Sequence, residues 1–305
     1  MKTLYIIGNG FDLWHKLPTS YSDFYNFARS TFDELENYYL FELHEHQPWH
    51  DFENSLGAFD ADSFFDFYNE VDVTSDDFRP RDIYGLEDEL TEQADNHVSI
   101  IQEAFNEWII SIDISEANRQ MEFAPNSKFI TFNYTSTLQT IYGIEQARVL
   151  HIHGRAETHD ELIFGHGKTI LETPDFDEEG ESTRHIFSDA EGAAMHPLYA
   201  LKKPVDDVLV KNESYFEQLA DINKIFIIGH SLNSIDLPYF QRINKFAKAA
   251  EWTICCYSET ERQSLVQSLI DSGVNQKQIK TIMYEELQSH PSHILPAVFS
   301  VSTAC

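Results

Sequence analysis

Four runs of strand-forming residues each lead into a short turn whose residue types could contact a phosphate or a sugar and take part in acid-base chemistry. The turns contain Gly8, Asn9 and Gly10; Asn133; His153; and Gly229, His230 and Ser231. Glycine allows the backbone to approach a phosphate closely, and an asparagine carboxamide can hold a sugar hydroxyl or a water. A histidine titrates near neutral pH and can serve as a general base. These turns therefore indicate a nucleotide site.

The first turn, in IIGNGFD, carries part of a dinucleotide-binding fingerprint. Two glycines stand at the first and second places of G-x-G-x-x-G, but Leu13 occupies the third. A simple strand-to-helix turn explains the glycines equally well, whereas Phe11 and Asp12 favour a functional role. An acid facing a pyrophosphate would be repelled, so Asp12 is expected to meet ribose hydroxyls or a helix N-terminus, or to hold the loop.

The second and third turns carry an amide and a cluster of histidines. Asn133, in ITFNYT, could cap the next helix, or could bind a sugar or position a water. HIHGRAETH and FGHG contain His151, His153, His159 and His166. No carboxylate and histidine follow them at an established metal-ligand spacing, so we predict no metal. We expect one of the strand histidines to be a general base and the other to be structural.

The fourth turn, in IIGHSLNSID, resembles the G-x-S-x-G nucleophile elbow of serine hydrolases. Asn233 stands where that elbow needs a small residue, so a hydrolase with Ser231 as nucleophile is the minority interpretation. Capping of the following helix by Ser231 or Asn233 fits better, as does contact with a phosphate or ribose. In PWHDFENSL, Glu53 belongs to an expected helix with inward aromatics, although an acid there could also reach over the sheet edge.

Strands alternate with helices over most of the chain, which predicts an α/β fold. We expect a Rossmann-like, sirtuin-like parallel sheet with helices on both faces and ligands beyond the carboxyl ends of its strands. The strands are expected to end at Asn133, at His153 and near Gly165, among other places. Residues 1–28 and 120–305 are assigned to this nucleotide-binding domain. Residues 29–119 are acidic and rich in aromatics, and are predicted to form a mostly helical insertion.

Charge and composition restrict the partners. The chain has 305 residues and a formal net charge of -30, which would repel a nucleic-acid backbone or an anionic membrane. Its three cysteines cannot form a disulfide framework or a four-cysteine zinc module. No stretch is long and apolar enough for a membrane helix, and no secretory signal is present. We therefore expect a cytoplasmic protein with a small nucleotide ligand and no direct nucleic-acid binding.

The chain resembles the AbiH family of bacteriophage abortive-infection proteins. The resemblance is carried, in order, by IIGNGFDLWHKLPTSYSDF, PWHDFENSL, ITFNYTSTLQTIYG, VLHIHG and IIGHSLNSID. It covers nearly the whole chain and implies a role in phage defence. The phage trigger is unknown, and the aromatics of the insertion suggest a lid or a homo-oligomer contact.

The same loops are similar, more distantly, to those of sirtuin-like NAD-binding domains. That resemblance places Asn133 and His153 on the catalytic asparagine and histidine. It also places Gly8, Gly10, Ser231 and Ser258 on nucleotide-contacting positions. Gly-Asn-Gly replaces the usual Gly-Ala-Gly, and the sirtuin zinc module is absent, which argues against removal of acyl groups from lysine. The resemblance implies an NAD glycohydrolase, with a non-catalytic NAD-sensing module as the alternative.

Overall fold

The computed structural model describes residues 2–35, 37–39, 49–171 and 174–289. The chain divides into two compact units, each with its own core. The sheet unit comprises residues 1–19, 112–161 and 205–305, and the helical unit comprises residues 20–111 and 162–204. The boundaries predicted from sequence differ from these, because they place 20–28 and 162–204 in the nucleotide-binding domain and 112–119 in the insertion.

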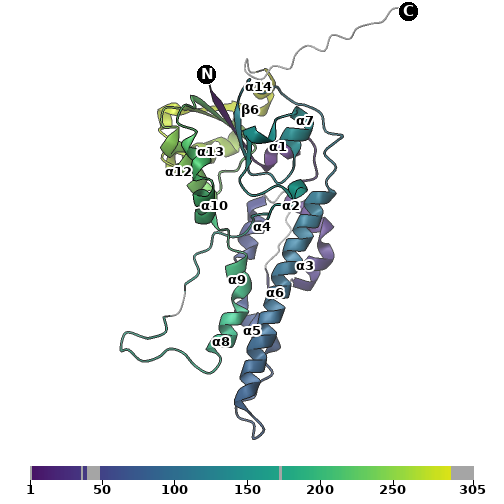
Figure 1. The fold of residues 1–305 in the computed structure, drawn as a ribbon, viewed down its shortest axis with the longest axis vertical. Helices are drawn as coiled ribbons and strands as arrows, with labels where there is room; N and C mark the ends of the chain where they lie inside the picture. Colours follow the sequence, from purple (N-terminus) through teal and green to yellow (C-terminus); the bar gives the residue numbers. More distant parts are fainter. Residues whose placement is uncertain (1, 36, 40–48, 172–173, 290–305) are drawn as a thin grey trace, which may run out of the picture. The chain divides into compact units, whose positions relative to one another are not determined.

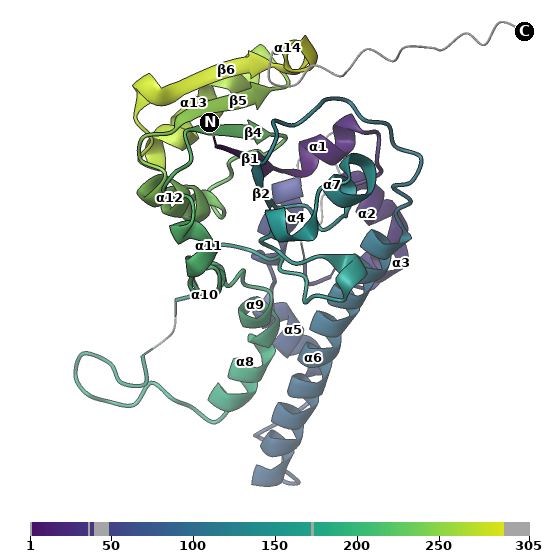
Figure 2. The ribbon, with the colours of Figure 1, turned by 45° about the horizontal axis from the view of Figure 1, so that its top comes forward.

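A six-stranded, all-parallel sheet is the centre of the sheet unit (Figure 1). Its strands are β1 (Thr3–Ile7), β2 (Lys128–Thr131), β3 (Val149–His151), β4 (Lys224–Ile228), β5 (Glu251–Cys256) and β6 (Ile279–Met283). The strand order is β3-β2-β1-β4-β5-β6, and Figure 2 shows β2, β1, β4, β5 and β6 side by side. This is the order of the Rossmann fold, with its topological switch point between β1 and β4. The predicted α/β class is confirmed.

Helices cover both faces of the sheet, so its strands read as continuous apolar runs. The helices of this unit are α1 (Asn9–Trp14), α7 (Thr137–Tyr142), α10 (Val205–Lys211), α11 (Glu213–Glu217), α12 (Leu237–Phe246), α13 (Glu259–Asp271) and α14 (Tyr284–Ser289). Short 3-10 helices span Gln146–Arg148, Ala156–Thr158 and Gln276–Gln278. Tyr5 and Ile7 pack with Phe11 of α1 and Leu138 of α7 on one face. Figures 1 and 2 show α12 on the other side of the sheet.

The glycines of the first turn are needed because β1 and β4 lead into loops that touch. The Gly10 N–H donates to Gly229 O at 2.8 Å. A Cβ on Gly8 would lie 2.6 Å from Gly229 O, and one on Gly10 would lie 2.8 Å from Gly229 Cα. Gly229 has a φ of +73°, a conformation that disfavours other residues. Close backbone packing at the switch point is thus a sufficient reason for these glycines.

Gly10→Ala should destabilise the protein by about 1–3 kcal/mol, because the added methyl group must displace backbone atoms. The matched control is Gly192→Ala, whose Cβ would meet nothing within 4 Å and which is an exposed position of helix α8 (Ser188–Ala194). That control should stabilise by up to about 1 kcal/mol. Urea unfolding measures both, and equal stabilities for the two variants would contradict the tight contact.

The helical unit consists of helices with an aromatic core. They are α2 (Tyr21–Phe27), α3 (Arg29–Leu35), α4 (Trp49–Leu56), α5 (Ala61–Tyr68), α6 (Pro80–Ser111), α8 and α9 (His196–Ala200). In α6, Val98, Ile101, Phe105 and Trp108 are spaced three and four residues apart and are buried, as on one face of an amphipathic helix. Ser20 caps α2 in a capping box with Asp23. The residues of α8 and α9 lie against α6.

Three strand predictions were wrong. β2 ends at Thr131, two residues before the predicted end at Asn133. β3 ends at His151, two residues before the predicted end, because the chain turns at Ile152 and His153. The ELIFGHG segment forms no strand; its His166 makes only an isolated bridge with Lys202. An apolar stretch of that length fits a buried loop as well as a strand, and periodicity cannot separate the two.

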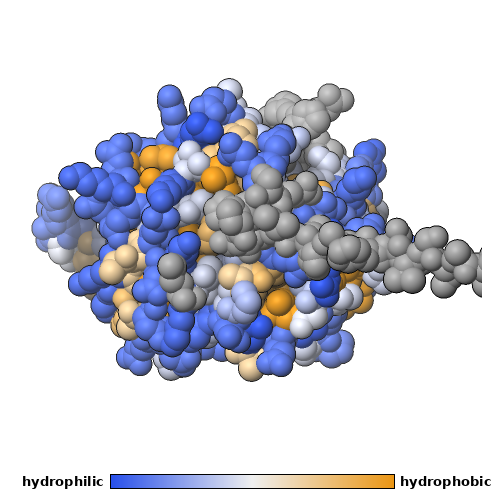
Figure 3. All heavy atoms as spheres, turned by 90° about the horizontal axis from the view of Figure 1, so that it is seen from above, coloured by the Kyte–Doolittle hydropathy of each residue, from blue (hydrophilic) through white to orange (hydrophobic). Residues whose placement is uncertain are grey.

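The surface is mostly polar where Figure 3 shows it. Hydrophilic side chains cover most of that face, and hydrophobic ones occur in small, separate patches. Such patches are ordinary for a protein surface, so the homo-oligomer stays a prediction. In the part of the chain that the structure describes, no helix is both long enough and apolar enough to span a bilayer.

Candidate functional site

The turns singled out in the sequence gather at the carboxyl end of the sheet. The first turn touches the fourth, because a Cβ on Gly8 would lie 2.6 Å from the Cα of His230. The ring of Phe132, beside Asn133, has its centroid 4.2 Å from that of His230 and 5.1 Å from that of His153. Residues from β1, β2, β3 and β4 thus form one contiguous group, as expected for loops at a switch point.

The backbone amides of the first turn are largely engaged within the protein. Gly8 N–H donates to Ile228 O at 3.0 Å, and Phe11 N–H donates to Gly8 O at 2.9 Å. The Asn9 side-chain amide donates to Thr19 O at 2.7 Å. Phe11 is buried in the core against His15 and Tyr142. Pyrophosphate binding by this loop stays a prediction, and the amides of Gly8, Gly10 and Phe11 already have acceptors.

Asp12 is a buried carboxyl group on α1. Thr135 Oγ1, in the loop after β2, donates to Asp12 Oδ2 at 2.5 Å, so the acid holds the two loops together. Burial raises the pKa of Asp12 to about 6, against smaller opposite effects of the Thr135, Thr137 and Asn133 side chains. Asp12 Oδ1 is buried and makes no hydrogen bond among the described residues. A half-satisfied buried acid is costly, which makes this a functional-site candidate.

Asp12→Asn should stabilise the folded protein above neutral pH. The folded-state pKa of Asp12, about 6, lies above its unfolded value, so Asp12 favours folding at low pH and loses that contribution as pH rises through 6. The advantage of the variant should grow by about 1 kcal/mol between pH 5 and pH 7 and then level off. Urea unfolding of both proteins across this range measures it, and parallel pH profiles would contradict it.

Asn133 is buried without satisfying its amide. Its backbone N–H donates to Thr131 Oγ1 at 3.1 Å. Neither amide atom of its side chain makes a hydrogen bond within the residues that the structure describes. The Asn133 side chain lowers the pKa of Asp12 slightly, so the two side chains lie close together. Their geometry nevertheless does not meet the criteria for a hydrogen bond. The helix-capping alternative is wrong, since α7 begins at Thr137 with Ser136 at its N-cap. A buried amide without partners is suited to a ligand or a water.

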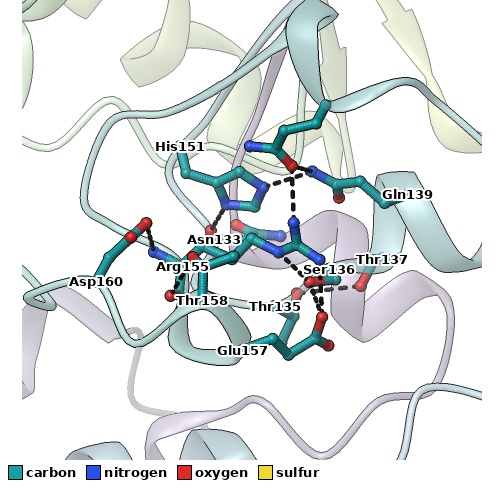
Figure 4. A network of polar contacts seen from close by, with 11 residues as sticks. Asn133, Thr135, Ser136, Thr137, Gln139, His151, Arg155, Glu157, Thr158 and Asp160 are labelled. Atoms are coloured by element: carbon teal, nitrogen blue, oxygen red, sulfur yellow. Dashed lines mark hydrogen bonds and ion pairs between the residues drawn. The ribbon is translucent and has the colours of Figure 1, made fainter.

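His151 is the structural member of the histidine pair. Its Nδ1 lies 3.1 Å from the Asn133 carbonyl oxygen and its Nε2 lies 2.9 Å from Gln139 Nε2, as Figure 4 shows. The carbonyl requires a proton on Nδ1, so Nε2 accepts from the glutamine amide and the ring is neutral. Burial lowers the pKa of His151 to about 4. His151 thus positions the Asn133 backbone.

A second set of polar contacts connects the loop after β2 with the loop after β3 (Figure 4). Arg155 donates to Ser136 Oγ, to Glu157 Oε2 and to Gln146 Oε1. Ser136 also donates to Glu157. A planar guanidinium with several fixed acceptors holds its neighbours rigidly. These hydrogen bonds therefore hold the loop that carries Asn133 to the loop that carries His153.

His153 lies in a different environment, beside an acid that the sequence reasoning missed. Its Nε2 is 3.8 Å from Asp236 Oδ1, and His230 Nε2 is 3.6 Å from Asp236 Oδ2. The three side chains are all buried. Tyr239 of α12 packs against His153, with ring centroids 5.5 Å apart. The signal was present in GHSLNSID, where an acid directly precedes the helix, but sequence spacing alone cannot show that it faces two histidines.

The remaining predicted residues lie at the margin of this group or have structural roles. Ser231 is exposed, and α12 begins only at Leu237, so no tight strand-to-helix elbow presents it. The predicted capping of α12 by Ser231 or Asn233 is wrong, because Asp236 occupies the N-cap position. Ser258 forms the capping box of α13 with Glu261. No group of three or more His, Cys, Asp or Glu side chains is arranged to hold a metal in the described ranges.

Comparison with known proteins gives one family. A family model described as Bacteriophage abortive infection AbiH matches residues 4–256, a range that contains all four turns. No curated protein and no solved structure matches the chain. The likeness to sirtuin-like domains therefore rests on the order of the loops in the sequence.

Proposed function

The chain belongs to the AbiH family of bacteriophage abortive-infection proteins, and we propose that it serves this defence by hydrolysing NAD at the bond between nicotinamide and ribose. The sheet order supports nucleotide binding, since dinucleotides bind across the switch point of such sheets. Consumption of NAD in an infected cell would serve abortive infection, by analogy with other defence proteins of this broad fold.

The observation that carries the proposal is the placement of His153 and Asn133. Both are buried in loops that follow adjacent strands, and the Phe132 ring next to Asn133 packs edge-on against His153. One side chain can take up a proton, and the other has amide atoms available to orient a hydroxyl or a water. Asp12, from the neighbouring loop, adds a carboxyl group suited to ribose hydroxyls.

Hydrolysis of the bond between nicotinamide and ribose requires few groups beyond His153, Asn133 and a water. In NAD the nicotinamide ring nitrogen is cationic, so the bond to the ribose C1′ breaks with its electron pair returning to that nitrogen. The water oxygen then bonds to C1′, and His153 accepts the proton that the water loses. Asn133 orients the water or the sugar hydroxyls. The products are nicotinamide, ADP-ribose and one proton.

The fixed charge at the site fits the reacting half of NAD. Asp12 and Asp236 are buried acids of this group, and in the reaction the nicotinamide ring is cationic and the sugar gains oxocarbenium character. Electrostatic stabilisation of charge that develops in a transition state is usually a large contribution to catalysis. The same carboxylates would repel the pyrophosphate, so in this proposal the phosphates lie away from both acids.

The direct experiment is to incubate the purified full-length protein with NAD and to measure free nicotinamide by chromatography. We expect nicotinamide and ADP-ribose in equal amounts. Protein heated beyond its unfolding temperature is the control. NAD recovered intact, with phage components present as well as absent, would contradict the hydrolase.

A nucleotide-sensing module is the second candidate, and burial favours it. Asn133 is 6% exposed, His153 is 3% exposed and Asp12 is 1% exposed, so a ligand reaches them only if the loops open. Opening linked to ligand binding would let NAD shift a defence assembly without being consumed. Calorimetric binding of NAD with no nicotinamide release would support sensing over hydrolysis.

A further inference from the structure

Asp236 has the sequence position of a helix cap but does not act as one. It occupies the N-cap of α12, where an aspartate side chain normally accepts a backbone N–H of the first turn. Here the side chain makes no such capping bond. Its two carboxylate oxygens instead face His153 Nε2 and His230 Nε2, at 3.8 Å and 3.6 Å. The local helix therefore does not explain where this carboxylate points.

The protonation of His230 follows from its backbone contact. Leu232 N–H donates to His230 Nδ1 at 2.9 Å, so this nitrogen must be an acceptor and the ring proton resides on Nε2. That N–H is the one that faces Asp236. Leu232 adopts a φ of +52°, which is uncommon for a residue other than glycine. Such strain persists where the surrounding structure enforces it, often at functional sites.

We propose that Asp236 is a positioning residue for His153: its carboxylate, held by the neutral His230, orients the His153 ring and stabilises the imidazolium that forms when His153 takes a proton. This proposal rests on the function proposed above, in which His153 is the base. The distances exceed those of a hydrogen bond, so the interaction is electrostatic in this state. Such contacts often tighten only when a substrate is bound.

The buried surroundings of His153 strengthen its electrostatic interaction with the Asp236 carboxylate. Phe132, Tyr134 and Tyr239 pack around the ring, and the Asp236 carboxylate, which also lies near His230, faces its Nε2 from the start of α12. Asp236 is 6% exposed. Charges in a site of low water content interact more strongly than they do on a surface. His151, two residues earlier, has no carboxylate in its hydrogen-bonding shell and provides an internal comparison.

The experiment is an NMR titration of the imidazole rings in protein labelled with ¹⁵N-histidine, for wild type, Asp236→Asn and Asp236→Glu. Signals are assigned with His151→Gln and His153→Gln. In the wild type, His153 should titrate at a higher pH than His151. In Asp236→Asn the midpoint for His153 should fall by about 1–3 pH units, since an opposite charge within about 4–6 Å favours the charged form. His151 should not move.

Two controls separate charge from packing. Asp236→Glu keeps the charge and should retain most of the wild-type midpoint, whereas Asp271→Asn removes an exposed carboxylate at the end of α13 and should change nothing. An unchanged His153 midpoint in Asp236→Asn would overturn the proposal, as would a Glu variant that behaves like the Asn variant. If Asp236→Asn does not fold, a wild-type His153 that titrates with or below His151 overturns it.

The titration needs no NAD, so it separates the two hypotheses. If wild type does not cleave NAD but the midpoint shifts as expected, the coupling of Asp236 to His153 stands and the hydrolase fails. If NAD is cleaved, Asp236→Asn should lower kcat near neutral pH by at least roughly tenfold with KM little changed. Cleavage at the wild-type rate in Asp236→Asn would overturn the positioning role.

Discussion

His153→Ala should lower the rate of nicotinamide release from NAD by about 10²-fold to 10⁴-fold, the usual contribution of a general base. Neither of the described histidines His151 and His230 can substitute for it. His230 is held neutral with Nδ1 occupied by the Leu232 N–H, and His151 is engaged by Gln139 and the Asn133 carbonyl. Single-turnover assays with NAD, followed by chromatography, measure the loss.

Two further variants make this result interpretable. His153→Gln preserves more of the packing against Phe132 and Tyr239 than alanine does, and should lose activity to a similar extent. His159→Asn replaces an exposed histidine of the same loop with a residue that tolerates its φ of +54°, and should keep full activity. Full NAD cleavage by a folded His153→Gln protein would remove His153 from the mechanism.

Glu53→Gln should destabilise the helical unit by about 3–5 kcal/mol, the usual cost of leaving one member of a buried ion pair without its partner. Glu53 Oε1 lies 2.7 Å from Lys203 Nζ, and the two side chains are 2% and 1% exposed. The pair connects α4 with the segment after α9, which are about 150 residues apart in the chain but belong to the same unit. Thermal and urea unfolding, monitored by circular dichroism, measure the change.

The double variant Glu53→Leu/Lys203→Met provides the decisive comparison. Apolar replacement of a whole buried pair is often neutral or stabilising, so the double variant should recover most of the lost stability. Glu103→Gln, an exposed carboxylate on α6, should stay within about 0.5 kcal/mol of wild type. A Glu53→Gln protein as stable as the Glu103→Gln control would show that the pair is not a buried charge interaction in solution.

The strand-and-turn pattern of the sequence was sufficient to predict the sheet. Leu4–Ile7 and the equivalent runs are continuous and apolar because both sheet faces are covered, and each run ends at a glycine or polar residue where the chain leaves the sheet. The α6 helix was readable from the spacing of Val98, Ile101 and Phe105. These features are local, so local pattern rules apply to them.

Other features depended on contacts that no local pattern reports. The ELIFGHG segment was expected to be a strand but belongs to the helical unit, where His166 bonds the Leu198 carbonyl. The sequence left two roles open for Glu53, as part of an expected helix or as an acid that reaches over the sheet edge. Its ion-pair partner Lys203 is far away in the chain. The sequence does not show whether a charged side chain is solvated or forms a buried ion pair.

The sequence by itself determined the family, the α/β class and the set of turns that gather at one end of the sheet, because glycines, strand formers and polar residues at strand ends act through nearby backbone geometry. Only the tertiary structure showed what the residues of each turn contact. It showed Gly8 and Gly10 packed on Gly229, His151 engaged by its neighbours, and Asp236 between two histidines. Those contacts join atoms from loops of separate strands, and the atoms come close only when the parallel sheet brings the strand ends together.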